Sequence, residues 1–142
     1  MKQTDIAEHF GEITTLIRQR FEVHFRETGL SESQAPILHF LLDTQGQRDI
    51  FQRDIETRFH IRPSSVSSVL RNMEKKDLIL RESSSEDARL KRIRLTSEGE
   101  KMARIAIDLN RKVNADLLGE MSEKDTLELA RLLKLVSDNI SR

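Results

Sequence analysis

The chain has 142 residues, the length of a single domain with a conventional hydrophobic core. Its 24 basic and 24 acidic side chains cancel, which argues against a polycation that binds nucleic acid through bulk charge alone. Because it contains no cysteine, disulfides, thiolate metal sites and thiol-based redox sensing are excluded.

The composition favours long helices with charged faces. Two prolines, five glycines and 34% charged residues are typical of a mainly helical protein and not of a sheet-rich enzyme. The first residues, MKQTDIAEHFGEI, carry acidic side chains where a secretory signal needs a basic and then an apolar run. No window approaches the ~18 apolar residues of a membrane span. The sequence therefore predicts a soluble cytoplasmic protein without a membrane partner.

Two helices are predicted in the first third of the chain. From the potential N-cap Thr4 to Gly29, apolar residues recur at steps of three or four, which indicates one long amphipathic helix. Its apolar positions are Ile6, Phe10, Ile13, Ile17, Phe21 and Phe25. Ser31 and Gln34 have the spacing of a capping box before a second, more buried helix, in whose first turn Pro36 falls. Residues 43–49 are polar and are predicted to form a loop.

The next segment has the outline of a helix-turn-helix. Phe51, Ile55 and Phe59 are spaced by four on a short helix, and Pro63 suits the first position of another. In the latter helix the inward stripe is predicted to be Val66, Val69, Leu70 and Met73. The opposite face then carries Ser64, Ser65, Ser68, Arg71 and Asn72, with Ser67 beside them.

A β-hairpin is predicted after that helix. Leu78–Leu80 is a short apolar strand candidate, SSSED is a turn cluster, and LKRIRLT alternates Ile93 and Leu95 with Arg92 and Arg94. Such a hairpin is the wing of a winged helix-turn-helix, with its arginines on the solvent face. Residues 62–94 hold nine basic side chains against five acidic ones, so the local charge is positive although the chain is neutral.

Two further helices complete the chain. The first has apolar residues at Met102, Ile105, Ala106, Leu109, Val113 and Leu117. The second is capped by Ser122 with Asp125 and has one apolar face formed by Leu129, Leu132, Leu133, Val136 and Ile140. These helices and the first are too long for a small winged helix to cover, so we expect them to pack against a second copy of the chain.

Two features carry a DNA-binding hypothesis. Serine is disfavoured inside a helix, but short hydroxyl side chains let a helix backbone approach phosphates and base edges in a major groove. At the hairpin tip, Arg89 can enter a minor groove with Asp87 orienting its guanidinium, while Lys91, Arg92 and Arg94 lie nearer phosphates. The alternatives are that the serines cap the helix and face water, and that the basic residues protect a solvated edge strand.

In these residues the chain resembles the MarR family of bacterial transcriptional regulators. The serine-rich helix ends in MEKKDLI, and Asp87, Ala88 and Arg89 are followed by Lys91 and by the closing pair Leu95 and Thr96. The order of elements is similar to that of the family over essentially the whole chain. By this resemblance the recognition helix contacts DNA through Ser64, Ser65, Ser67, Ser68 and Arg71, and the wing does so through Asp87 and Arg89. Lys91 and Arg92 are further wing candidates because of their place on the hairpin. Where the family usually has glycine at the end of the recognition helix, this chain has Asp77, which tolerates positive φ better than most residues.

The resemblance also implies the domain organisation. It implies one domain over 1–142, mainly α (α+β), with a winged helix-turn-helix lobe at 30–95. The helical regions 1–28 and 97–142 would form an intertwined homodimer on a pseudopalindromic double-stranded DNA operator.

Many relatives bind small aromatic or phenolic effectors between the dimer helices and the lobe. The corresponding candidates here are Phe21, His24, Phe25, His39 and Phe40, whose alternative role is in the core. His9, His24, His39 and His60 lack ligand spacing, so neither a metal nor another cofactor is predicted. Enzymatic motifs are absent from the sequence.

The sequence therefore predicts a dimeric winged helix-turn-helix transcription factor, specifically a repressor released from its operator by a small molecule. The alternative is a winged helix that serves as a protein-interaction module without specific DNA binding.

Overall fold

The computed structural model describes residues 5–84 and 86–141, so the predicted cap at Thr4 and Ser85 of the hairpin turn lie outside the described residues. Within those ranges the chain forms six helices and two strands. In order they are α1 (Asp5–Phe25), α2 (Ala35–Thr44), α3 (Gln52–Phe59), α4 (Pro63–Lys75), β1 (Ile79–Ser83), β2 (Lys91–Leu95), α5 (Ser97–Leu118) and α6 (Glu123–Ile140). The prediction of a mainly helical winged helix-turn-helix fold is confirmed.

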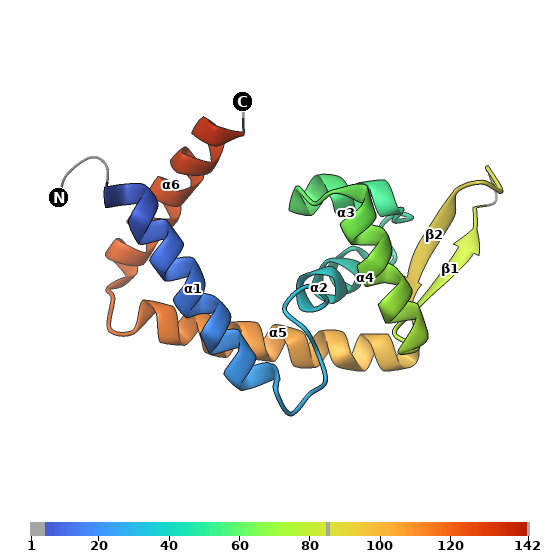
Figure 1. Cartoon of the computed structure of the whole chain (residues 1–142), viewed down its shortest axis with the longest axis horizontal. Coiled ribbons are helices and arrows are strands. Elements are labelled where there is room, and N and C mark those ends of the chain that lie inside the picture. The colour runs from blue at the N-terminus through green and yellow to red at the C-terminus, as the bar shows by residue number, and fades with distance from the viewer. Residues whose placement is uncertain (1–4, 85, 142) are drawn as a thin grey trace.

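The other elements are arranged along the long helix α5 (Figure 1). The lobe of α2, α3 and α4, with the β1–β2 hairpin beyond it, sits over the N-terminal half of α5. Helix α1 crosses the other half, and α6 turns back from the far end. The wing is therefore at one extremity of the molecule, and the α1–α6 side is at the other.

The core lies where α2, α4 and the wing strands meet α5. Its fully buried side chains include Ile37, Leu38, Ile55, Val66, Leu70 and Met73, together with Ile79 of β1 and Ala103 of α5. The inward stripe predicted for α4 is confirmed, because Val66, Leu70 and Met73 are buried and Val69 packs against the same cluster. The helix-turn-helix is thus held rigidly from one side, which leaves its other side free.

The wing is an antiparallel two-stranded sheet in which Ile79 pairs with Leu95 and Ser83 pairs with Lys91. The segment before α3 extends it, because the amide of Ile93 donates to the carbonyl of Ile50 at 2.7 Å and Phe51 forms a bridge with Arg92. These contacts attach the start of α3 to the base of the wing. The relative positions of the first helix of the helix-turn-helix and the hairpin are therefore set by backbone hydrogen bonds.

The capping box predicted at Ser31 and Gln34 is wrong. Helix α2 begins at Ala35 with Gln34 at its N-cap, and the Ser31 hydroxyl contacts that of Ser33 at 3.0 Å. Gln34 is instead buried, with only 3% of its surface exposed. Pro36 lies in the first turn as predicted, and the polar loop is shorter than predicted because α2 continues through Thr44.

Helix α4 ends at Lys75, and Asp77, which the sequence predicts at the helix end, follows the C-cap Lys76 with φ of 58°. The Leu78 amide donates to the Met73 carbonyl at 2.9 Å and the Asp77 amide donates to the Glu74 carbonyl at 3.0 Å. This is a Schellman motif with aspartate in the left-handed position where glycine is usual. The buried side chains of Leu78 and Met73 supply the apolar contact that accompanies the motif.

The long helices α1 and α6 leave much apolar surface uncovered. Ile6, Ile13 and Leu16 of α1 are between 47% and 56% exposed, and four residues of the predicted α6 face are between 37% and 80% exposed. Those four are Leu129, Leu132, Leu133 and Ile140. Among the described residues, helices lack the length and apolarity that a membrane crossing requires.

Candidate nucleic-acid interface

The outward face of α4 is small, polar and exposed. Ser64, Ser65, Ser68 and Arg71 are all solvent-exposed, as is Asn72. They are exposed because Val66, Leu70 and Met73 point into the core, and helical periodicity places the polar residues on the opposite side. Pro63 occupies the first turn, so the helix begins abruptly at this face. A surface of this shape lets the helix backbone approach a flat or grooved partner closely.

Ser67 differs from the other serines of α4. Its hydroxyl is bonded to Nε2 of Gln52 at 2.8 Å, and the same amide donates to the Pro63 carbonyl at 3.2 Å. Ser67 therefore fastens α4 to α3 at the edge of the exposed face. Sequence reasoning placed Ser67 beside the outward residues and missed Gln52. The three-residue spacing between Ser67 and the buried Leu70 is a signal that Ser67 lies at the edge of the exposed face. A direct contact of Ser67 with a partner remains a prediction.

The wing tip is organised around Asp87. Its Oδ1 accepts the backbone amide of Arg89 at 3.0 Å and Nε of the same residue at 3.3 Å, while Oδ2 accepts Nη2 at 3.4 Å. The backbone hydrogen bond, and then the side-chain one, lower the pKa of Asp87 from its ordinary value. The carboxylate is therefore charged at neutral pH and orients the guanidinium of a side chain that is 91% exposed. The predicted orientation of Arg89 by Asp87 is present.

The base of the wing is less basic than its sequence indicates. Arg92 lies 3.0 Å from a carboxylate oxygen of Glu82 and 3.9 Å from one of Asp49, and only a third of its side chain is exposed. Arg94 shares the same Glu82 carboxylate at 3.5 Å. The prediction that the arginines stand on the solvent face therefore holds better for Arg94 than for Arg92. Lys91 remains exposed, with its ammonium 2.9 Å from the hydroxyl of Ser83.

A basic depression of about 360 Å³ separates the wing from the start of α3. Its wall includes Arg53, Arg81, Arg89 and Lys91. Arg81 is paired with Glu74, whereas Arg53 projects from the first turn of α3 and is exposed. Sequence reasoning missed Arg53, because only the hydrogen bonds between residues 50–51 and β2 bring the first turn of α3 next to the wing.

A second pocket, of about 580 Å³, lies between α1, α2, α3 and α5. Four of the five candidate effector residues line it, namely Phe21, Phe25, His39 and Phe40. His24 does not line the pocket, and its Nε2 lies 3.5 Å from Asp116 of α5. Sequence reasoning missed Phe59 and Arg58, which come from α3; the Arg58 guanidinium stacks over the Phe59 ring at 5.1 Å.

The structure is compatible with both roles considered for Phe21 and Phe25, packing in the core and lining an effector pocket. Phe25 is buried in the core and stacks on Phe21 with ring centroids 5.3 Å apart, yet both rings also border the pocket. Metal-binding groups of three or more His, Asp or Glu side chains are not found among residues 5–84 and 86–141.

An exposed polar helix, a preceding helix fastened to it, and an adjacent charged hairpin define the class of the protein: it is a winged helix-turn-helix protein. Residues 28–90 match the model of the MarR family. The chain is a MarR family winged-helix transcriptional regulator, a family that is not enzymatic.

Relatives agree with this assignment. The chain is 26% identical over 132 residues to the HTH-type transcriptional regulator YdgJ of Bacillus subtilis, covering 93% of this chain and 74% of that one. It superposes on MepR from S. aureus, solved as a DNA complex, with a TM-score of 0.85, 26% identity and coverage of 94% and 97%. A MarR family regulator from Listeria monocytogenes, crystallised with a 26mer DNA, matches with a TM-score of 0.84, 25% identity and coverage of 99% and 90%.

Proposed function

We propose that this regulator is a homodimeric repressor that binds a pseudopalindromic DNA operator. In each subunit α4 enters a major groove with Ser64, Ser65, Ser68 and Arg71, and Arg89 reaches into the adjacent minor groove. The observation that carries the proposal is the exposed hydroxyl and guanidinium face of α4 beside an arginine held outward by Asp87. Relatives of similar fold were crystallised with DNA, which supports the same use here.

Phosphate contacts position helix α4 and Arg89 on the DNA. Lys91 of the wing and Arg53 of α3 border the basic depression, where a strand of the backbone would pass between the two grooves. Arg92 and Arg94 contribute less, because Glu82 already neutralises part of their charge. Ser67 acts through α3, since its hydroxyl is bonded to Gln52.

Dimerisation follows from the uncovered helices. Helices α1 and α6 carry exposed apolar side chains, and both helices lie in the part of the molecule away from the wing (Figure 1). Burying them against the same helices of a second chain removes apolar surface from water and places two winged lobes on one DNA duplex. The two recognition helices must then lie about one helical turn of DNA apart, ~34 Å.

The effector site is the pocket between α1, α2 and α3. Its phenylalanines offer aromatic faces and edges, and Glu32, Asp43 and Arg58 offer polar groups, so a small aromatic or phenolic molecule fits its chemistry. Because the wall comes from both the lobe and the long helices, such a ligand favours one lobe separation over another. The ligand lowers the affinity for DNA by shifting the population away from the dimer conformation that binds the operator.

The salt dependence of DNA binding tests this proposal. The probe is a palindromic duplex selected from a random library by the wild-type protein. The logarithm of the association constant should fall linearly with the logarithm of salt concentration, with a slope of about −0.9 for each phosphate neutralised. A scrambled duplex of the same length and composition is the control, and it should bind weakly at every salt concentration.

The competing hypothesis is a winged helix that contacts another protein and leaves the wing as a solvated edge. It predicts that no duplex is enriched in the selection and that binding shows no steep salt dependence. Either result would rule out the DNA-binding function.

A further inference from the structure

Helix α4 is also tied to the part of the chain that joins it to the dimer helices. Its last residues include Lys75 and Lys76, which are both exposed, but only the second makes a contact beyond the helix. The ammonium of Lys76 donates to the Gly29 carbonyl at 3.2 Å and lies 3.5 Å from Oε1 of Gln34. A cation at the end of α4 therefore holds the turn between α1 and α2.

Gln34 makes this junction specific. It is the buried polar residue at the start of α2, with 3% of its surface exposed, and burial of an amide oxygen is costly unless a donor reaches it. Lys76 is that donor. Gly29, the second acceptor, has φ of 75°, a conformation that turns its carbonyl at little steric cost because glycine has no side chain.

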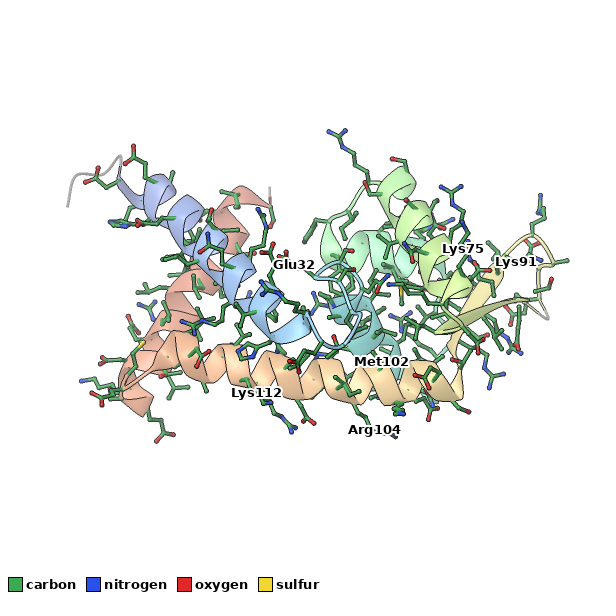
Figure 2. The ribbon with its side chains drawn as sticks, turned by 60° about the horizontal axis from the view of Figure 1, so that its bottom comes forward. Glu32, Lys75, Lys91, Met102, Arg104 and Lys112 are labelled. Carbon is green, nitrogen blue, oxygen red and sulfur yellow. The ribbon has the colours of Figure 1, made fainter. Side chains whose placement is uncertain are left out.

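The same turn is held on its other side and borders the pocket. Glu32 pairs with Arg18 of α1 at 3.4 Å, and Figure 2 labels Glu32 beside α1 and Lys75 on the separate helix α4. Glu32, Ala35 and Pro36 also form part of the pocket wall. The turn between α1 and α2 is thus attached to a dimerisation helix, to the recognition helix and to the candidate effector site.

We propose that Lys76 is a positioning residue for DNA binding, which fixes the recognition helix to the α1–α2 turn and so sets its angle relative to the dimer helices. The inference rests on the proposed function and deepens it by naming the link between pocket and DNA. Lys76 acts through Gly29 and Gln34 and not through a phosphate, although a lysine at this end of a recognition helix resembles a phosphate contact. A ligand that displaces the turn acts on α4 through this junction.

The test compares Lys76→Met with Lys75→Met, which removes the same charge from the preceding position. Removal of the tether leaves α4 and the turn free to move separately, so affinity for the selected palindromic duplex falls roughly threefold to tenfold through lost preorganisation. The slope of affinity against salt stays at the wild-type value, because the lost hydrogen bonds were within the protein. Amide hydrogen exchange in residues 28–34 becomes several-fold faster in Lys76→Met and is unchanged in Lys75→Met. Lys76→Arg, which keeps donors at this site, retains slow exchange.

A double-mutant cycle measures the coupling between Lys76 and Gln34. Gln34→Met combined with Lys76→Met should cost less affinity than the two single effects together, whereas Gln34→Met with Lys75→Met should be additive. A salt slope for Lys76→Met reduced by about 0.9 identifies the lysine as a phosphate contact and overturns the inference, as does unchanged exchange in the turn. If wild-type protein fails to select any duplex, the proposed function fails instead, so the two failures are distinguishable.

Discussion

At the scale of single residues, the wing tip shows how a short charged side chain organises a long one. Asp87 accepts both the backbone and the side chain of Arg89, so the guanidinium is presented outward and not folded onto the hairpin. Because Asp87 already restricts the Arg89 side chain in the free protein, little further side-chain entropy is lost when Arg89 binds DNA. The lowered pKa of Asp87 keeps this arrangement charged well below neutral pH.

Replacing Arg89 by alanine should weaken binding of the selected duplex by about 1–3 kcal/mol, through loss of the minor-groove contact. The proposed dimer and the melting temperature should be nearly unchanged, since the side chain is exposed. Binding is measured by fluorescence anisotropy and stability by calorimetry. Arg111→Ala, which removes an exposed arginine from α5, is the control and should leave DNA affinity intact. Unfolding of the Arg89 variant would show that the residue is structural.

Asp77 stores a small backbone cost at the end of the recognition helix. Its φ of 58° is strained for a residue with a side chain, and glycine adopts it freely. We expect Asp77→Gly to stabilise the fold by about 0.5–1 kcal/mol, measured by urea denaturation. In the wild type the Thr96 hydroxyl donates to the carbonyl of residue 77 at 2.5 Å, and the glycine variant keeps that carbonyl. A destabilised variant would mean that the aspartate carboxylate makes a compensating contribution.

At the scale of elements, the start of α5 is where the wing and the long helix are joined. Thr96 caps α5 by accepting the Gly99 amide at 2.9 Å, and its own amide donates to the Leu78 carbonyl at 3.1 Å. Gly99 lies so close to the residue before β1 that an added Cβ would sit 1.9 Å from the Leu78 carbonyl oxygen. Glycine is required here for close approach between a helix and a strand, even though its φ is ordinary for a helix.

Gly99→Ala should therefore destabilise the protein by about 1–3 kcal/mol or more, because backbone has to move to admit the methyl group. Helix propensity acts in the opposite direction, by about 1 kcal/mol, so a net loss isolates the steric effect. Chemical denaturation measures the change. Ser97→Ala, at an exposed position of the same helical turn, should stay within about 0.5 kcal/mol of the wild type. A stabilised Gly99→Ala variant would contradict the close packing.

At the scale of the whole molecule, the distribution of apolar surface matters more than net charge. The lobe has its own buried core, whereas the leucines of α6 are exposed, and Leu129, Leu132 and Leu133 share its predicted apolar face. Charged residues of α5 point away from the lobe, as Arg104 and Lys112 do in Figure 2. Most of the exposed apolar side chains of the described residues therefore lie on α1, α6 and the C-terminal end of α5, where we propose that the second subunit binds, whereas Leu80 and Leu90 are exposed on the wing.

Leu133→Lys places a charge on the apolar face of α6, and we expect it to convert the proposed dimer into a monomer at micromolar concentration. Sedimentation equilibrium measures the change. Affinity for the palindromic duplex should also fall by orders of magnitude, because one lobe contacts only a half-site. Leu127→Lys is the matched control: this leucine is 65% exposed and lies on the opposite side of α6 by helical spacing. A monomeric Leu127 variant with a dimeric Leu133 variant would place the interface on the other face.

The sequence by itself determined the elements and their faces. The apolar periodicity located α1, α4, α5 and α6, and local signals located the α4 start at Pro63, its end at Asp77 and the cap at Ser122. The inward stripe of α4 and the pairing of Asp87 with Arg89 also follow from residues a few positions apart. All these features depend on interactions within about one helical turn or one tight turn, which the order of residues specifies directly.

Only the tertiary structure decided how those elements share their polar groups. Ser67 with Gln52, Arg92 with Glu82, and Lys76 with Gly29 are separated by 15, 10 and 47 residues respectively. Gln34 illustrates the limit, because its spacing from Ser31 indicates a cap, whereas packing buries it beside Lys76. Such contacts depend on the angles and distances at which helices pack, and these are set by the whole core and not by any local pattern.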